Sequence, residues 1–306
     1  MSDNSHIEWT DASWNPIRTR IGEKVGWGCQ RVSPGCQHCY AATINHRLGT
    51  GLDYDAKGIA AAEFFLDEKT LVKPLSWRKP RKVFVCSMTD LFGEWVPDEW
   101  IDRMFAIMAQ TPQHTYQLLT KRPERMRSYM TLPGRGDLQI NRMGRVAQYI
   151  SSPHVARNLD WPLPNVWLGV SVEDQQRADE RIPVLLETPA AVRFLSCEPL
   201  LGPVDLGRNM YVGRFFDLGT PDISWVIIGG ESGPGARPMD VGWARSLVSQ
   251  CQSAAVACFV KQLGAKPYEM PLLYDLNYSR PMKLADRKGG DMGEWPEDLR
   301  VREFPI

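Results

Sequence analysis

Three cysteines lie close together in one short stretch near the N-terminus. The stretch GWGCQRVSPGCQHCYA, residues 26–41, contains Cys29, Cys36 and Cys39, with six residues between the first two and two between the second pair. Glycines and a proline in the stretch supply turns that let a short loop direct its thiolates toward one centre. Thiolates are soft ligands that suit zinc and iron–sulfur clusters. The loop therefore predicts a metal or cluster site.

The number of thiols bears on whether the loop holds zinc or an iron–sulfur cluster, but it does not decide between them. Three thiolates are one ligand short of a structural tetrahedral zinc site, and they suit a [4Fe-4S] cluster that keeps one iron open. His38 or His46 would complete a Cys3His zinc site. In a third alternative, the cysteines bind no metal and pack as small apolar side chains. Spacing alone leaves zinc and iron–sulfur open.

Composition limits the class of protein. The 306 residues carry 36 Lys and Arg against 36 Asp and Glu, so no overall charge attracts nucleic acid or membrane. The N-terminus is polar and acidic, and the longest apolar runs are far shorter than a membrane span. The remaining cysteines are scattered, which favours metal binding in a reducing compartment over disulfides. We expect a cytoplasmic protein with no membrane partner.

The rest of the chain alternates short apolar runs with stretches of helical spacing. The expected strands are residues 83–87, 115–120, 165–172, 191–197, 223–230 and 257–262, and the expected helices are 98–110, 175–187 and 241–254. Runs that are apolar throughout are typical of strands covered on both faces. The alternation predicts an α/β fold, a full or partial (β/α) barrel of parallel strands.

The expected barrel spans residues 1–273, with a first strand at 6–11 that leads into the cysteine loop. Residues of about 129–164, rich in Arg, Gly, Pro and Ser, predict an irregular or partly helical insertion. Residues 274–306 predict a C-terminal appendage packed on the barrel. Because reactive centres of such barrels lie at the C-terminal ends of the strands, a loop after the first strand would lie at the mouth. That position favours the iron–sulfur interpretation.

Several segments resemble one enzyme superfamily. WNP followed by GCQRVSPGCQHCYA is similar to the cluster loop of radical S-adenosylmethionine (SAM) enzymes, in particular the spore-photoproduct-lyase-like branch. CSMTDLFGEWVPDE (86–99) and LLTKRPERM (118–126) resemble segments that follow the second and third strands of that branch. The first cysteine spacing is six residues where the superfamily usually has three. Residues 18–27 look inserted, and we expect them to form a hairpin.

The resemblance extends along most of the chain. IEWTDASWNP, SPGCQHCYA, IIGGESGPGARPM, FVKQLG and KGGDMGEWPEDLRVREFP are similar to shared segments of a phage and bacterial family of three-cysteine proteins with no assigned reaction. The resemblance implies a [4Fe-4S] cluster whose open iron binds SAM, and an electron donor such as flavodoxin or ferredoxin. The reduced cluster would cleave SAM to methionine and a 5′-deoxyadenosyl radical that abstracts hydrogen from a substrate.

Each part of SAM then needs a partner near a strand end. Ser87, Thr89 and Asp90 would offer oxygens to the SAM ammonium, and Lys121 would offer a cation to its carboxylate. Ser171 and Glu173 would accept hydrogen bonds from the ribose hydroxyls. Tyr40 would pack on the cluster or the adenine. Glu198, Glu231 and Lys261 end later strands, and we expect them to ring the same mouth as catalytic groups. Two alternatives stay open: Asp90 as a turn or cap residue, and Lys121 with Arg122 as a solvated loop pair.

The expected substrate is a nucleoside, nucleotide or nucleic acid. Residues 121–157 hold many basic residues, with aromatic residues in or near the segment, which can track phosphates and stack bases. An ordinary solvated surface is an equal alternative for this segment. Two other functions remain open: a zinc-stabilised nucleic-acid-binding protein without redox activity, and a radical SAM enzyme that acts on a peptide or small metabolite.

Overall fold

The computed structural model describes residues 5–131, 137–207, 223–270 and 279–305, without the side chains of 137–141. The chain divides into two compact units. Unit 1 contains residues 1–169 with 187–192, and unit 2 contains 170–186 with 193–306. The predicted boundary near 274 lies outside the described residues, and the predicted domain limits stay predictions.

The described residues form a seven-stranded sheet with the order β1-β5-β6-β7-β8-β9-β11. The strands are β1 (Ala12–Trp14), β5 (Lys82–Val85), β6 (Thr115–Thr120), β7 (Val166–Ser171), β8 (Val192–Cys197), β9 (Trp225–Gly229) and β11 (Ala257–Gln262). In unit 1, β1 pairs with β5 and β5 with β6, all parallel. In unit 2, β8 pairs with β9 and β9 with β11, also parallel. The predicted α/β class is confirmed, and the open strand order fits a partial barrel.

The expected strands and helices occur close to their predicted positions. The helices are α4 (Asp98–Ala109), α8 (Gln175–Leu186) and α9 (Val241–Ser253). In α4 the apolar residues predicted at helical spacing are buried, among them Ile101, Met104 and Phe105. Helix α9 begins after Asp240, whose carboxylate accepts the backbone N–H of Gly242 at 2.8 Å.

The predicted first strand at 6–11 is wrong. Residues 7–10 form a turn in which Thr10 N donates to Ile7 O, and β1 begins only at Ala12. The side chains of Thr10 and Asp11 explain the shift, because they hydrogen-bond to the backbone C=O and N–H of Lys82. Polar side chains that bond the neighbouring backbone compete with a regular ladder at this end of the strand.

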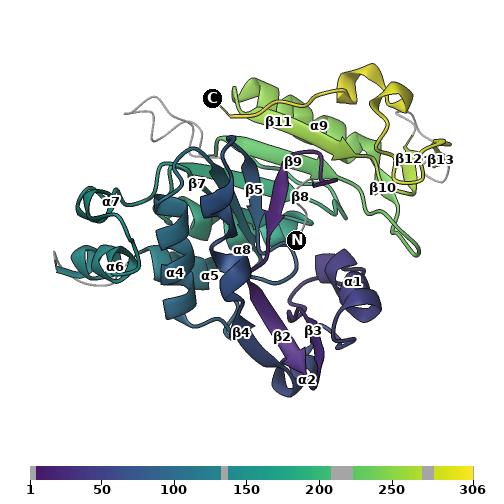
Figure 1. The fold of residues 1–306 in the computed structure, drawn as a ribbon. Coiled ribbons are helices and arrows are strands. Elements are labelled where there is room, and N and C mark those ends of the chain that lie inside the picture. The colour runs from purple at the N-terminus through teal and green to yellow at the C-terminus, as the bar shows by residue number, and fades with distance from the viewer. Residues whose placement is uncertain (1–4, 132–136, 208–222, 271–278, 306) are drawn as a thin grey trace. The chain divides into compact units, whose positions relative to one another are not determined.

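The predicted hairpin is confirmed and belongs to a small sheet. Strands β2 (Ile17–Ile21) and β3 (Lys24–Gly26) pair antiparallel, with Gly22 at φ 54° in the turn. Strand β4 (Glu63–Leu66), which was not predicted, pairs with the other side of β2. Helices α1 (Tyr40–Leu48) and α2 (Ala56–Ala61) lie between β3 and β4 in the chain, and the group is drawn in the purple and blue part of Figure 1.

The segment predicted as an insertion is largely helical. It contains α6 (Asp137–Ala147) and α7 (Pro153–Arg157), and the end of α5 (Pro123–Met130). Helix α6 packs on α4, as Figure 1 shows. The remaining elements of unit 1 are η1 (Pro34–Cys36), α3 (Glu68–Leu71) and η2 (Lys73–Ser76).

The C-terminal residues of unit 2 pack on its strands. Two short turns of 3-10 helix bury Trp295 and Leu299, and Phe304 contacts the rings of Trp225 and Phe259. Val260 also donates its backbone N–H to Val301 O at 2.8 Å. The remaining elements are β10 (Met239–Asp240), β12 (Pro267–Glu269), β13 (Arg280–Pro281), η3 (Met292–Glu294) and η4 (Glu297–Leu299).

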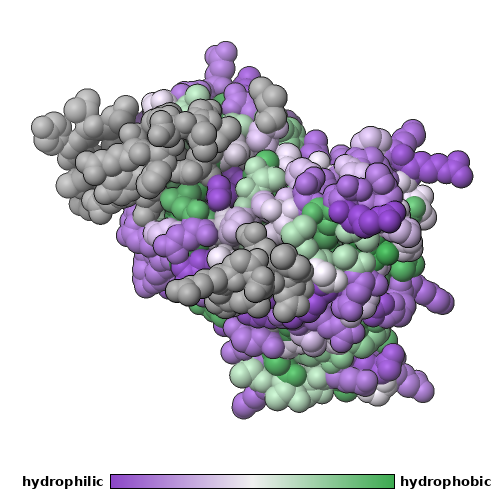
Figure 2. Space-filling model, turned by 90° about the vertical axis from the view of Figure 1, so that its left-hand side faces the viewer, coloured by the Kyte–Doolittle hydropathy of each residue, from purple (hydrophilic) through white to green (hydrophobic). Residues whose placement is uncertain are grey.

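The surface drawn in Figure 2 is mainly hydrophilic, and apolar residues appear on it in separate small patches. None of the helices in the described part of the chain is both long and apolar enough to span a bilayer.

Candidate functional site

The three loop cysteines lie in unit 1, between the β2–β3 hairpin and α1. Cys36 ends the 3-10 turn η1, and Cys39 is the residue before α1. All three are free thiols with partly exposed side chains. Cys29 and Cys39 pack against a small buried cluster formed by Ala41, Ala42, Tyr54 and Met88. The loop therefore has its own anchoring core.

The thiols are near one another but do not form a preassembled site. Burial is the main cause that raises the pKa of Cys29 to about 12; Asp90 raises it further, Arg122 opposes this, and Cys39 and Cys36 add smaller increases. Cys29 is therefore a neutral thiol near pH 7 unless a cation replaces its proton. Within the described ranges, no three His, Cys, Asp or Glu side chains come close enough together to hold a metal ion.

The turn after β5 fastens the cysteine loop. Tyr40 donates its hydroxyl to Ser87 O at 2.7 Å, and Tyr54 donates to Met88 O at 2.7 Å. Thr89 donates its hydroxyl to Gly28 O, next to the first cysteine, at 2.5 Å. Because β1, β5 and β6 are parallel, these bonds hold the loop at the C-terminal end of β5, where reactive groups gather in α/β sheets.

The shape of this turn depends on two residues of its own. Cys86 adopts φ 56°, which ends β5 and reverses the chain. Asn15, which follows β1 and is 3% exposed, accepts the Met88 N–H at 3.0 Å and donates to Ser87 Oγ at 3.1 Å. Asn15 of the WNP segment therefore braces the turn that receives the loop.

A second anchor comes from the end of β6. Arg122 is 7% exposed, and its Nη2 donates to Gln30 O at 3.2 Å. Its Nη1 donates to Asp90 Oδ2 at 3.2 Å, and its Nε donates to Glu94 Oε2 at 3.1 Å. The guanidinium also lies over the Trp95 ring, 4.6 Å from the centroid. The alternative of a solvated Lys121–Arg122 pair is wrong for Arg122.

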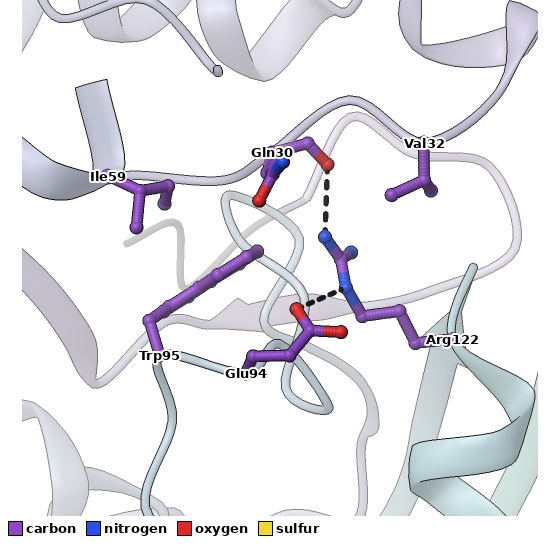
Figure 3. A pocket seen from close by; sticks show the side chains of 6 residues that line it. All are labelled: Gln30, Val32, Ile59, Glu94, Trp95 and Arg122. Atoms are coloured by element: carbon purple, nitrogen blue, oxygen red, sulfur yellow. Dashed lines mark hydrogen bonds and ion pairs between the residues drawn. The ribbon is translucent and has the colours of Figure 1, made fainter. Parts of the chain in front are cut away.

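These side chains line an open pocket beside the loop (Figure 3). Its volume is about 540 Å³, and its lining residues are Gln30, Val32, Ile59, Glu94, Trp95 and Arg122. Figure 3 shows the Arg122 guanidinium between the Gln30 carbonyl and the Glu94 carboxylate. The residues between the first two cysteines thus form one wall of the pocket.

Four of the predicted SAM-binding residues lie in this loop or in the turn that fastens it: Tyr40, Ser87, Thr89 and Asp90. Lys121 bonds to Asp90 through its backbone N–H. Asp90 is 6% exposed, and its carboxylate accepts bonds from protein groups: the Thr120 hydroxyl at 2.7 Å, the backbone N–H groups of Phe92 and Lys121 at 3.0 and 3.1 Å, and Arg122. These bonds give Asp90 a structural role at the turn. SAM binding by this group of residues stays a prediction.

Ser171 and Glu173 lie in unit 2, at and just beyond the end of β7. Glu173 is fully buried and pairs with Arg181 of α8 at 2.9 Å. The same Arg181 Nη1 donates to Ser171 O at 2.8 Å. The two residues predicted to bind ribose are thus joined by one buried arginine, and their ribose contacts stay a prediction.

The predicted catalytic residues Glu198, Glu231 and Lys261 follow or end neighbouring strands of unit 2. Lys261 Nζ donates to Glu198 Oε1 in an ion pair, and both side chains are 17% exposed. Glu231, 7% exposed, instead makes a forked pair with Arg237. The structure therefore brings Glu198 and Lys261 together. That all three residues share a mouth with the cysteine loop stays a prediction.

The arginines of the predicted basic segment are largely paired with carboxylates of unit 1. The ion pairs are Arg122 with Asp90 and Glu94, Arg125 with Asp98, Arg127 with Glu187, and Arg142 and Arg145 with Asp98 and Asp102. Arg135 lies outside the described residues. Arginines bound this way fasten α6 to α4 and contribute little net charge for binding phosphates.

Replacing Arg145 with Gln is therefore expected to leave nucleic-acid affinity unchanged. Arg145 is 41% exposed and already paired with Asp98 and Asp102, so the loss of stability should stay within about 1 kcal/mol. The salt concentration that elutes each protein from a DNA column measures the effect. Elution of Arg145→Gln at clearly lower salt than wild type would show that this surface does bind phosphates.

Sequence reasoning missed the residues that position the loop. Asn15, Tyr54 and Arg122 carry no chemical signature of their own, and Trp95 and Gln30 read as ordinary loop residues. Four of these five residues, all except Tyr54, fall within segments that resemble the superfamily, and this resemblance was the one signal in the sequence that could have found them. Their bonds join residues that are up to 92 positions apart in sequence.

The comparisons with known proteins give one result. The model of a family described as Protein of unknown function (DUF5131) matches residues 4–290. The chain belongs to the DUF5131 family. The matched DUF5131 region includes the three loop cysteines and every residue that anchors the loop. No curated protein and no solved structure matches the chain.

Proposed function

We propose that this protein is a radical SAM enzyme in which Cys29, Cys36 and Cys39 hold a [4Fe-4S] cluster. The observation that carries the proposal is the donor set: three free thiols on one loop, fastened to the C-terminal ends of β5 and β6. The soft donors match the cluster in type and number. Convergence of the thiols on one centre is itself part of the proposal, because the described residues bring no three such side chains close enough to hold a metal ion.

The chain's own groups would prepare this site. The bonds of Tyr40 to Ser87 O and of Thr89 to Gly28 O hold the two ends of the loop against the turn after β5, and Asn15 fixes that turn. Tyr40 presents a half-exposed ring directly after the last cysteine. Together the cluster and SAM would supply one-electron cleavage of the sulfonium and a 5′-deoxyadenosyl radical.

The acid–base groups of unit 2 complete the proposal. Lys261 holds a proton at Nζ in its hydrogen bond to Glu198, and this pair is proposed to exchange protons with a substrate. Glu231 is proposed as a further catalytic carboxylate at the end of β9, held in place by its forked pair with Arg237.

Among the expected substrates, a nucleoside or nucleotide is favoured over a nucleic-acid polymer. The paired arginines of unit 1 remove the main support for a surface that tracks phosphates. The bond of His46 Nε2 to Asp53 at 2.9 Å leaves the zinc alternative open, because a metal-binding histidine commonly bonds a carboxylate through its other ring nitrogen.

Cleavage of SAM tests the proposal as a whole. Protein prepared without air, reconstituted with iron and sulfide, and reduced with dithionite is expected to convert SAM to methionine and 5′-deoxyadenosine. Liquid chromatography with mass spectrometry measures both products. The proposed reaction would be contradicted if the iron-loaded, reduced protein formed no more of either product than a control mixture without protein.

A further inference from the structure

The backbone carbonyl of Gln30 contacts both the first cysteine and Arg122, which follows β6. Cys29 Sγ lies 3.9 Å from Gln30 O, within the range of a weak S–H bond. Arg122 Nη2 donates to the same oxygen at 3.2 Å. The carbonyl of the residue next to the first cysteine is thus fixed by a side chain that follows β6.

The guanidinium itself is held from several sides. Asp90 binds Nη1, Glu94 binds Nε, and the Trp95 ring covers the planar group. Asp90 is in turn fixed by Thr120 and by two backbone N–H groups. Because these contacts already fix the planar guanidinium, it loses little conformational entropy when it also binds the Gln30 carbonyl. Lysine has one ammonium in place of this fork and cannot reproduce the set of contacts.

We infer that Arg122 is a positioning residue for the cysteine loop, which sets the place of Cys29 through the Gln30 carbonyl. The part of this inference that concerns the cluster rests on the proposed function. It gives a role to Arg122, a residue to which no binding role had been assigned. Six residues separate Cys29 from Cys36, and a longer loop has more conformations to restrict. A tether at Gln30 removes part of that freedom before a metal is bound.

The first arm of the test needs no cluster. Metal-free wild type, Arg122→Gln and Arg122→Lys are treated with iodoacetamide, and peptide mass spectrometry follows the labelling of each cysteine. Labelling of Cys29 is expected to be several-fold faster in Arg122→Lys, because this variant keeps the positive charge beside Cys29 while its loop has lost the tether. Arg122→Gln also loses that charge, which favours the reactive thiolate, so its increase should be smaller. Arg103→Gln is the matched control: Arg103 makes a forked pair with Glu68 on the same unit, and its loss should leave the rate unchanged.

The second arm measures iron. Loss of a group that orients metal ligands typically lowers metal affinity about 10- to 100-fold. Arg122→Gln and Arg122→Lys are therefore expected to lose iron to a chelator faster than wild type and Arg103→Gln. The electron paramagnetic resonance signal of the reduced cluster should also change in the two Arg122 variants, an effect that a general loss of stability would not produce.

Circular dichroism of each variant establishes that it is folded. If Arg122→Gln does not fold, Asp90→Asn with Arg122→Gln removes the buried charge together with its partner and takes its place. A folded variant with wild-type labelling of Cys29 and wild-type iron retention would overturn the inference. Wild type that binds no iron would overturn the proposed function instead, and the labelling arm would still decide the role of Arg122.

Discussion

Cys36→Ala is expected to abolish cluster binding. A cluster with three cysteine ligands loses a third of its protein ligands with Cys36. Fold stability should change little, because Cys36 is only partly buried and is absent from the small core that holds Cys29 and Cys39. Iron content after anaerobic reconstitution measures the result.

Cys251→Ala is the matched control for this prediction. Cys251 is a buried thiol on α9 of unit 2, so its loss can affect packing but should leave iron content at the wild-type level. Equal iron in wild type, Cys36→Ala and Cys251→Ala would mean that the iron is bound elsewhere or nonspecifically. That outcome would remove Cys36 from the ligand set.

Glu173→Ala is expected to lower the free energy of unfolding by about 3–5 kcal/mol, because it leaves Arg181 buried without its charged partner. Glu173 is 0% and Arg181 5% exposed, and their charged atoms are 2.9 Å apart. Chemical denaturation monitored by circular dichroism measures the change. The effect should appear without SAM, since the pair is internal to unit 2.

Two further variants separate the causes of this effect. Glu187→Ala breaks the more exposed pair with Arg127 and should change stability by no more than about 1 kcal/mol. Glu173→Leu with Arg181→Met replaces both charges by apolar groups and should recover much of the loss. If Glu173→Ala were as stable as wild type, the buried pair would not hold the end of β7, and Glu173 would be available for the predicted ribose contact.

The regular elements were predictable because their signals are local. The apolar runs of β6 and β11 and the helical spacing of α4 each lie within one short window of sequence. Strand β1 was misplaced because the side chains of Thr10 and Asp11 bond to Lys82, which is more than 70 positions away in sequence. Short strands such as β4 lack a pattern long enough to recognise.

The candidate site was likewise predictable only in part. The cysteine loop can be recognised from residue type and spacing. The role of Arg122 cannot, because it depends on Gln30, Asp90 and Glu94, which come from other parts of the chain. The ion pairs of the basic segment could not be predicted for a related reason. Counting arginines in one stretch cannot reveal that Asp98 and Asp102 of α4 lie against them.

The most direct test of the proposed cluster is the metal content of wild-type protein purified without air. We predict about four iron and four acid-labile sulfide per chain, with a brown colour that dithionite bleaches. Stoichiometric zinc in place of iron, or no bound iron after anaerobic reconstitution of the folded protein, would contradict the account.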